Sequence, residues 1–454
     1  GRGFGGILIF LLLAGEYYST FTLLGASGWA YSKGAPSLYV IAYVGLACFT
    51  SYWLMPPIWR YAKKHNLVSQ SEFFASKYKS STLGVLVTLV GVLSLVPYIV
   101  LQFKGLGIIV SVTSYGEISP TVAICIGMIV MFVYVMISGI HGSAMNAAIK
   151  DILSLVVIVF MGLYLPFHYY GGMQEMFEAI EQAKPNFLAL PSEGMSISWF
   201  ISTVLLTTVG FYMWPHGMSA AFSAKNEKVF RSNAIVMPLY GLILLFAFFV
   251  GFASILQVPG LVGAESDLAL LKLTMQTFDP WFVGLLGAAG LLCALVPGSL
   301  MLMASATMLA KNIYGAIYPQ ASGQKIARVA KIFVAVISVI ALILALDKGN
   351  SLGALFLISY SLVTQLFPAF ICSLFTNNFI TKQGAFAGIV CGVATVMYVT
   401  ITKTSMGALF PSAPQAIQDL NIGLIAMIFN FSAMILVSLV TRRSKAILSE
   451  KKAA

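Results

Sequence analysis

The sequence predicts an all-α polytopic membrane protein. Of the 454 residues, 59% are hydrophobic and only 9% are charged, whereas about a quarter of the residues of an ordinary soluble protein carry charge. Apolar runs of about 20 residues, the length that crosses a bilayer as a helix, recur along the whole chain. This composition disfavours a secreted domain, a soluble enzyme and a nucleic-acid-binding protein. The partner that it implies is the lipid bilayer.

The apolar runs divide into twelve expected helices. The eighth is long enough to extend beyond the bilayer or to bend at Pro297. The helices are expected at residues 5–32, 37–61, 81–113, 119–140, 143–170, 196–220, 232–257, 278–316, 325–346, 351–375, 383–403 and 420–441.

The basic residues test this layout, because lysine and arginine concentrate in short cytoplasmic loops. Nineteen of the 26 fall on one side of the expected membrane and five on the other. This asymmetry places the start of the first helix, the C-terminus and a tail at 442–454 in the cytoplasm. The remaining two basic residues lie within helices. We therefore expect a multi-pass protein of the bacterial cytoplasmic (inner) membrane.

Four ionisable residues lie inside expected helices: Glu16, Lys104, Lys150 and Asp151. Such residues are costly in a membrane and usually mark pathways or binding sites. An internal salt bridge between one of the acids and one of the lysines is the structural alternative, and a transport site can itself contain such a pair. The five scattered cysteines have no metal-ligand spacing and are expected to pack as small core residues.

The first expected helix contains an unusually polar stretch at residues 11–28. It holds Glu16, five hydroxyl side chains between Tyr17 and Thr22, and glycines at Gly15, Gly25 and Gly28. An unpaired polar group in hydrocarbon costs several kcal/mol, so we expect this helix to line a wet cavity and to bend or unwind there. Hydroxyls that bond back to their own helix are the alternative, but they leave the carboxylate unexplained.

The sixth expected helix is interrupted at residues 207–220. Pro215 removes a backbone donor, and Gly210 and Gly217 loosen its flanks. A simple proline kink is the alternative. Helices one and six are five apart, so they occupy matching positions if the chain contains two five-helix repeats of opposite orientation. Interrupted helices at such positions indicate the binding site of a secondary transporter.

This spacing predicts one transmembrane domain over residues 1–454. We expect a first repeat, an inverted second repeat, two peripheral helices and a cytoplasmic tail, at residues 5–170, 196–375, 383–441 and 442–454.

Several motifs, in this order and spacing, resemble the sodium:solute symporter family. They are GASG (25–28), SQSEFFASKY (69–78), PYIVLQFKGLG (97–107), GSAMNAAIKDIL (142–153), SATMLAKNIY (305–314) and LFPAF…GAFAGIVCG (366–392). The resemblance covers nearly the whole chain and implies a LeuT-type inverted-repeat fold. It also implies a further helix upstream of Gly1. Within the family, the stretches around both interruptions are most similar to bacterial monocarboxylate permeases.

The resemblance implies a sodium site between the first interruption and helix eight. The carbonyl positions fall at Gly15 and Tyr18, and the helix-eight positions fall near Cys293, Val296 and Pro297. The family's paired hydroxyls are absent there, and a hard cation requires oxygen ligands. We therefore expect a degenerate sodium site.

We hypothesise that a second departure from the family pattern compensates for the degenerate sodium site. Where the family commonly has a hydroxyl residue followed by aspartate, this chain has Lys150–Asp151. A lysine ammonium can replace a bound cation, so we expect proton coupling, with Na⁺ as the alternative coupling ion. A lysine that reaches the cytoplasmic headgroups is the structural alternative. The candidate ion-coupling residues are Gly15, Glu16, Tyr18, Lys150 and Asp151.

Lys104 is the candidate partner for a substrate carboxylate, because sialic-acid carriers of this family use a basic residue in the corresponding region of helix three. A charge-assisted hydrogen bond is about twice as strong as a neutral one. Tyr360 and Gln365 of helix ten are weaker candidates. The candidate substrate-binding residues are Tyr17, Ser19, Thr22, Tyr98, Gln102, Lys104, Tyr212 and Trp214.

The expected function is ion-coupled import of small monocarboxylates such as lactate or pyruvate, by alternating access. We expect no enzymatic activity, no cofactor and no obligate protein partner. The alternatives are a sodium-coupled symporter of proline, acetate or pantothenate, a solute-sensing membrane domain, and a passive channel.

Overall fold

The computed structural model describes residues 10, 18–347 and 349–453, and every regular element within them is helical. Ten helices of this part of the chain are long and apolar enough to cross a membrane, and a bent pair brings the number to eleven if it is counted as one span. Helices suit this environment because each backbone group is satisfied within its own segment. Residues 5–9 and 11–17 of the expected helix at 5–32 lie outside the described residues.

The described part of the first half of the chain contains six α-helices and two short turns, one π-helical (η1) and one 3₁₀ (η2). The long helix α6 holds two spans, Pro120–Ile137 and Asn146–Tyr170, as the sequence predicts. The elements are η1 (Phe21–Gly25), α2 (Ala26–Lys33), η2 (Ala35–Leu38), α3 (Tyr39–Lys64), α4 (Gln70–Tyr78), α5 (Ser81–Thr113), α6 (Pro120–Tyr170) and α7 (Met173–Ala183).

The second half repeats the pattern of one interrupted helix followed by long spans. Its elements are α8 (Ile197–Gly210), η3 (Phe211–Met213), α9 (Pro215–Phe222), α10 (Lys228–Gly241), α11 (Ile243–Gln257), η4 (Gly263–Leu268), α12 (Ala269–Thr277), α13 (Pro280–Met308), η5 (Leu309–Tyr314), α14 (Gly315–Ile317), α15 (Gly323–Ala345), α16 (Leu352–Val363), η6 (Thr364–Leu366) and α17 (Phe367–Leu374).

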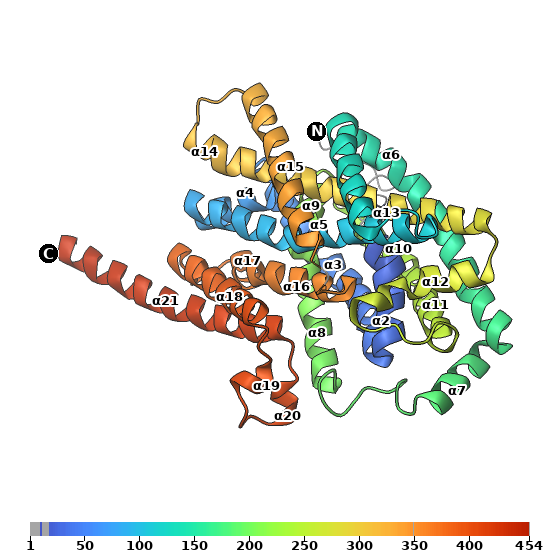
Figure 1. Cartoon of the computed structure of the whole chain (residues 1–454). Helices are drawn as coiled ribbons and strands as arrows, with labels where there is room; N and C mark the ends of the chain where they lie inside the picture. Colours follow the sequence, from blue (N-terminus) through green and yellow to red (C-terminus); the bar gives the residue numbers. More distant parts are fainter. Residues whose placement is uncertain (1–9, 11–17, 348, 454) are drawn as a thin grey trace.

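The last two long helices pack side by side at the margin of the bundle (Figure 1). They are α18 (Lys382–Thr402) and α21 (Ile422–Ala453), and the short helices α19 (Met406–Leu409) and α20 (Gln415–Gln418) connect them. Their place agrees with the peripheral pair that the sequence predicts.

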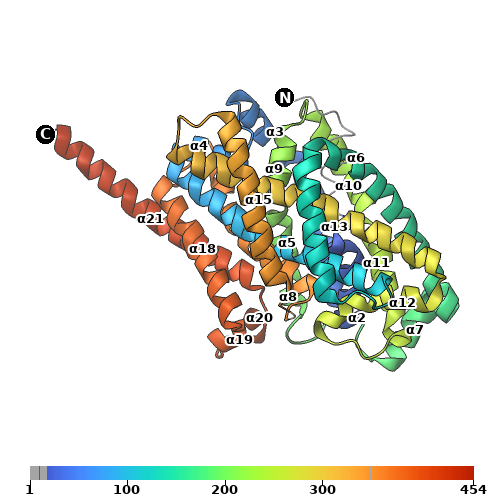
Figure 2. The same ribbon diagram turned by 45° about the horizontal axis from the view of Figure 1, so that its top comes forward.

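The short helices gather at opposite ends of the bundle (Figure 2). Helices α7, α12, α19 and α20 lie at one end, which we call the α7 end, and α4 lies at the other, the α4 end. The basic-residue asymmetry predicts that the α4 end faces the cytoplasm.

Helix α4 is stabilised locally by a capping box. The hydroxyl of Ser69 accepts a hydrogen bond from the Glu72 amide (3.3 Å), and the Glu72 carboxylate accepts one from the Val68 amide (2.8 Å). These bonds satisfy amide donors that the first turn of a helix leaves without partners.

Helix α4 also bonds to four other parts of the molecule. The Gln70 amide donates to the Met213 carbonyl in η3 (2.8 Å), and Ser71 pairs with Thr88 of α5 (2.7 Å). Further bonds join Tyr78 to the Ala369 carbonyl of α17 (2.6 Å) and Glu72 to Lys311 of η5. Helix α4 thus connects the first half of the chain to the second.

Candidate functional site

The first expected interruption falls at the start of the described stretch, where Tyr18 and Ser19 are not helical and precede the π-helical turn η1. Local side chains satisfy the amides that the interruption frees. The Phe21 amide donates to the Ser19 hydroxyl (3.2 Å), and the Ser19 amide donates to the Thr22 hydroxyl (3.4 Å). The hydroxyls that the sequence singles out therefore stabilise the start of a helix in a buried position.

Helix α5 holds this interruption in place through Gln102. Its side-chain oxygen accepts hydrogen bonds from both the amide (3.3 Å) and the hydroxyl of Thr20. Gln102 and Thr20 are both fully buried. The predicted substrate residue Gln102 thus bonds to the interrupted backbone rather than lining the cavity described below.

The second interruption lies at Trp214, between η3 and α9. Trp214 has extended backbone angles (φ −68°, ψ 124°), and Pro215 begins α9, where its missing N–H costs no helical hydrogen bond. The helix axis bends by 51° at this point. The predicted break in the sixth expected helix is confirmed, and its physical cause is the proline.

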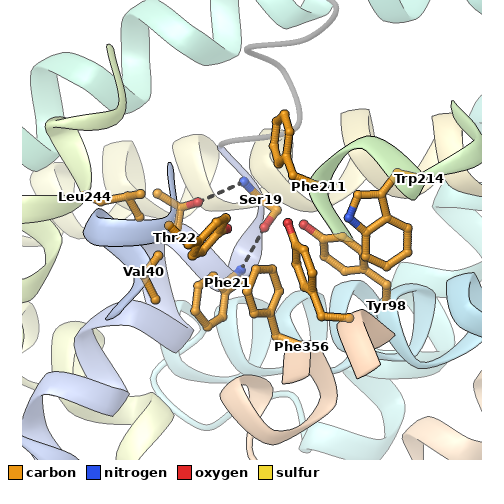
Figure 3. A pocket seen from close by; sticks show the side chains of 11 residues that line it. Ser19, Phe21, Thr22, Val40, Tyr98, Phe211, Trp214, Leu244 and Phe356 are labelled. Atoms are coloured by element: carbon orange, nitrogen blue, oxygen red, sulfur yellow. Dashed lines mark hydrogen bonds between the residues drawn. The ribbon is translucent and has the colours of Figure 1, made fainter. Parts of the chain in front are cut away.

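The two interruptions enclose a small central cavity (Figure 3). The space open to a water-sized sphere is about 30 Å³, enough for a water molecule but for little more. Its described lining contains hydroxyl and aromatic groups and no charged side chain. The lining residues are Ser19, Phe21, Thr22, Val40, Tyr43, Tyr98, Phe211, Trp214, Leu244, Phe356 and Tyr360.

Aromatic rings form most of the cavity wall. Phe21 stacks on Phe356 with ring centroids 4.0 Å apart, and Trp214 lies 5.3 Å from both Tyr98 and Tyr360. Such walls give a small solute a fixed shape to fit, while the hydroxyl groups of Ser19 and Thr22 supply polar contacts.

Lys150 lies directly beside the first interruption. Its side chain is completely buried, and its ammonium donates to the Tyr18 carbonyl oxygen (3.0 Å) and pairs with the Asp151 carboxylate (3.2 Å). A buried charge is tolerated only when it is paired and hydrogen-bonded, as this one is. The pairing of two intramembrane charges that the sequence left open is therefore present between Lys150 and Asp151.

The helix-eight residues singled out in the sequence are buried in α13. Cys293 contacts the Ser154 hydroxyl (Sγ to Oγ 3.1 Å), and Val296 is an apolar core residue. Since neither side chain carries an oxygen, α13 offers no hard-cation ligand at these two positions.

The other predicted site residues are dispersed. Tyr212 lies outside the central cavity and donates its hydroxyl to the Ala47 carbonyl. Gly15, Glu16 and Tyr17 lie outside the described residues. Gln365 bonds to the Ser361 and Gly423 carbonyls, away from the cavity.

Lys104 also lies outside the cavity lining, nearer the α7 end. Its ammonium donates to the Asn350 carbonyl (3.2 Å), just before α16, and its charge interacts with Asp347 and Asp267. Asp267 lies on η4, is 2% exposed, and accepts a hydrogen bond from the first amide of α16, at Leu352 (2.8 Å). The structure thus places Lys104 among acidic groups and leaves its predicted role with a substrate carboxylate as a proposal.

Gly28 allows η4 to approach helix α2 this closely. A Cβ atom at Gly28 would lie 2.8 Å from the Asp267 carboxylate and 2.9 Å from the Ser266 carbonyl, which is closer than van der Waals contact. Asp267 could not be identified from the sequence, because a short turn outside the spans has no hydrophobic periodicity and its burial depends on partners far away in the chain.

The stability of the folded protein is expected to depend on pH through the carboxyl group of Asp267. Burial raises the pKa of its carboxyl to about 7, although the Leu352 amide and the Lys104 charge favour the ionised form. A raised pKa in the folded state means that the folded state gains stability as the pH falls from about 7 toward the ordinary value of 3.8, and loses it as the pH rises through 7. We expect the melting temperature of the wild type to fall relative to that of Asp267→Asn as the pH rises from 5 to 8.

The matched control for this measurement is Glu265→Gln, which changes an exposed acid of the same short turn. The pH profile of that variant should follow the wild type. Parallel profiles for wild type and Asp267→Asn would contradict the assignment.

The fold is shared with solved transporter structures. A sodium-coupled sialic acid symporter in a substrate-bound, outward-open state superposes with a TM-score of 0.76 at 17% identity, covering 96% of this chain and 89% of that one. Two interrupted helices around a central cavity, in this architecture, define the class of LeuT-type membrane transporters. The model of the sodium:solute symporter family matches residues 1–392. The chain belongs to the sodium:solute symporter family.

Two relatives extend the comparison. The uncharacterized symporter YhjB of Bacillus subtilis is 58% identical over 453 residues, which cover 100% of this chain and 93% of the relative. The monocarboxylate transport permease protein of Rhizobium johnstonii is 27% identical over 401 residues, which cover 86% of this chain and 78% of the relative.

Proposed function

We propose that the protein is a secondary active symporter that imports small monocarboxylates and is coupled to protons rather than sodium. The observation that carries the coupling is the Lys150 ammonium on the Tyr18 carbonyl. In the family this carbonyl position serves a sodium ion, and here a tethered cation occupies the same kind of contact.

The residues opposite Lys150 support the same proposal. A sodium ion at this point would need oxygen ligands from α13, where Cys293 and Val296 stand. A sodium ion would also have to share the Tyr18 carbonyl with an ammonium 3.0 Å away, and two like charges so close repel each other strongly in a medium of low dielectric constant.

Lys150 is part of the chain and cannot dissociate as a bound ion does. Coupling through its charge therefore requires the movement of a proton. A sodium ion completes its cycle by dissociating, whereas a tethered ammonium changes its charge only by releasing a proton. Asp151 lies 3.2 Å from that ammonium and is the neighbouring group that can exchange a proton with it. We therefore assign the coupling step to the Lys150–Asp151 pair.

The substrate class rests on the cavity and on one relative. The aromatic rings and hydroxyl groups of the cavity wall suit the apolar and polar parts of a short organic acid, for which the cavity must widen beyond its present volume. The positive end of the helix dipole that begins at η1 favours an anion beside Ser19. A relative whose name is monocarboxylate transport permease supports the same class. Lys104 belongs to this proposal only as a charge that attracts anions toward the α7 end.

The proposal includes a place and an orientation. The protein lies in the bacterial inner membrane with the α4 end and the C-terminus in the cytoplasm, as the basic-residue asymmetry predicts. Residues 5–170 and 196–375 are the two inverted repeats.

Uptake into proteoliposomes tests the proposal. Labelled lactate, pyruvate, acetate and proline are offered under separately imposed sodium and proton gradients. We expect accumulation of at least one monocarboxylate when the outside is acidic, with no requirement for sodium. Accumulation that depends on sodium at fixed pH would contradict the coupling, and accumulation of proline alone would contradict the substrate class. Equilibration without accumulation under either gradient would contradict ion-coupled transport, and counter-flow of labelled substrate would then separate a carrier from a channel.

A further inference from the structure

A second cavity of the described chain lies away from the central cavity. Its volume is about 520 Å³, and it is enclosed by α8, α16, α18 and the chain between α18 and α21, toward the α7 end. No lining residue of the central cavity contributes to it. A cavity of this size matches the volumes that hold small organic ligands.

The charge lining this second cavity is entirely negative. Among the described residues that line it, Glu193 and Asp419 are acidic, and none is lysine, arginine or histidine. Glu193 is exposed, whereas Asp419 is only 7% exposed. The cavity therefore attracts cations and repels the anions that the central site is proposed to carry.

Asp419 is only partly satisfied by the protein. One carboxylate oxygen accepts hydrogen bonds from the Gly194 amide (2.9 Å) and the Gln415 side chain (2.8 Å), while the other is buried without a hydrogen-bond partner. A buried charged group that lacks a partner is costly. A cationic donor in the cavity would bond to this second oxygen only after the carboxylate turns, because the oxygen is covered as the side chain stands.

Part of the cavity lining is apolar. Trp199 of α8, Leu357 and Ile358 of α16, and Val396 and Val399 of α18 form it. An indole ring binds ammonium groups through its face and alkyl groups through its surface. The combination of a carboxylate, an indole and aliphatic side chains suits a ligand with an ammonium group and an apolar body.

We propose that this cavity is a binding site for a primary organic amine, held by Asp419 at its ammonium group and by Trp199 and the valines at its apolar body. Two sources share this chemistry: a free amine from the α7-end solution and the ethanolamine headgroup of a phospholipid. The site is separate from the transport site, so it stands whether or not the protein carries monocarboxylates.

The position of the cavity connects it to the transport path. Helix α16 lines it with Leu357, Ile358 and Ser361, and lines the central cavity with Phe356 and Tyr360. An occupant therefore contacts the same turn of helix that carries two aromatic walls of the central cavity.

Thermal unfolding of the purified full-length protein tests the site. Benzylamine supplies the ammonium and an apolar ring, and benzyl alcohol is its neutral control. We expect benzylamine to raise the melting temperature saturably, by about 2 °C when well above its dissociation constant, and benzyl alcohol to have no such effect. The shift should disappear in Asp419→Asn and persist in Asp279→Asn, which alters an exposed aspartate.

A second variant keeps the test valid if Asp419→Asn fails to fold. Val399→Phe fills the cavity and leaves the carboxylate in place, so it should also abolish the benzylamine shift. Equal shifts from both benzyl compounds, or a shift that survives both variants, would overturn the proposal.

Lipid nanodiscs distinguish the two sources. If the ligand is the lipid, the wild type should be more stable in phosphatidylethanolamine nanodiscs than in phosphatidylcholine nanodiscs. Asp419→Asn should not gain this stability. If it is a free amine, the lipid headgroup should make no difference and the benzylamine shift should remain in both. Absence of any effect of benzylamine and of phosphatidylethanolamine would also overturn the proposal.

Discussion

Replacing Lys150 by methionine is expected to abolish concentrative uptake and to destabilise the protein. Methionine fills a similar volume but removes the ammonium that bonds to Tyr18 and pairs with Asp151. Breaking a buried ion pair by removing one partner costs about 3–5 kcal/mol, because the remaining charge stays buried and uncompensated. The measurements are uptake under an imposed proton gradient and the melting temperature of the purified variant.

A double variant separates the two effects. Lys150→Met combined with Asp151→Leu removes both charges, so much of the lost stability should return, whereas uptake should not. The matched control is Lys331→Met, which changes an exposed lysine of α15 and should alter neither quantity. Full uptake by the stable double variant would show that this ion pair has no part in coupling.

Replacing Gly353 by alanine is expected to have the largest purely steric effect. Gly353 lies in the first turn of α16, where a Cβ atom would overlap the indole ring of Trp29. That ring is 4% exposed and lies against Tyr39 and Trp199, so it has little room to move. Overpacking a rigid site typically costs about 1–3 kcal/mol, so we expect the melting temperature of Gly353→Ala to fall by several degrees.

Gly284→Ala is the control, and its expected change in melting temperature is not a decrease. Gly284 lies in α13 with open space around its Cα atom, and alanine favours a helix over glycine by up to about 1 kcal/mol. The melting temperature should therefore stay constant or rise. A decrease of similar size in both variants would mean that overlap with Trp29 is not the cause.

The fold could be predicted because its signals are local. Pro215 cannot donate a helical hydrogen bond, and the apolar runs have the length of a bilayer, so the break and the spans follow from short stretches of sequence. The central residues Ser19, Thr22 and Trp214 could be predicted for the same reason, since they flank the two interruptions. They line one cavity together with Tyr98 of α5.

The remainder of the site depends on contacts between distant segments. Nothing in the sequence around Lys104 indicates that its ammonium bonds to the Asn350 carbonyl and interacts electrostatically with Asp267. Phe21, Tyr43 and Phe356 line the cavity, but in the sequence they are ordinary aromatic residues of apolar helices. Asp419 likewise becomes notable only when its cavity is seen.

The bonds of α4 have a consequence for how the α4 end can open. This helix bonds at once to η3, α5, α17 and η5. If η3 and α9 move away from the bundle, the Gln70–Met213 bond must break, and η5 is tied to the same nine-residue helix through Glu72. Separate contacts would yield one by one and give a graded opening. Contacts that converge on one short rigid helix are lost together, so opening at this end should be an all-or-none event.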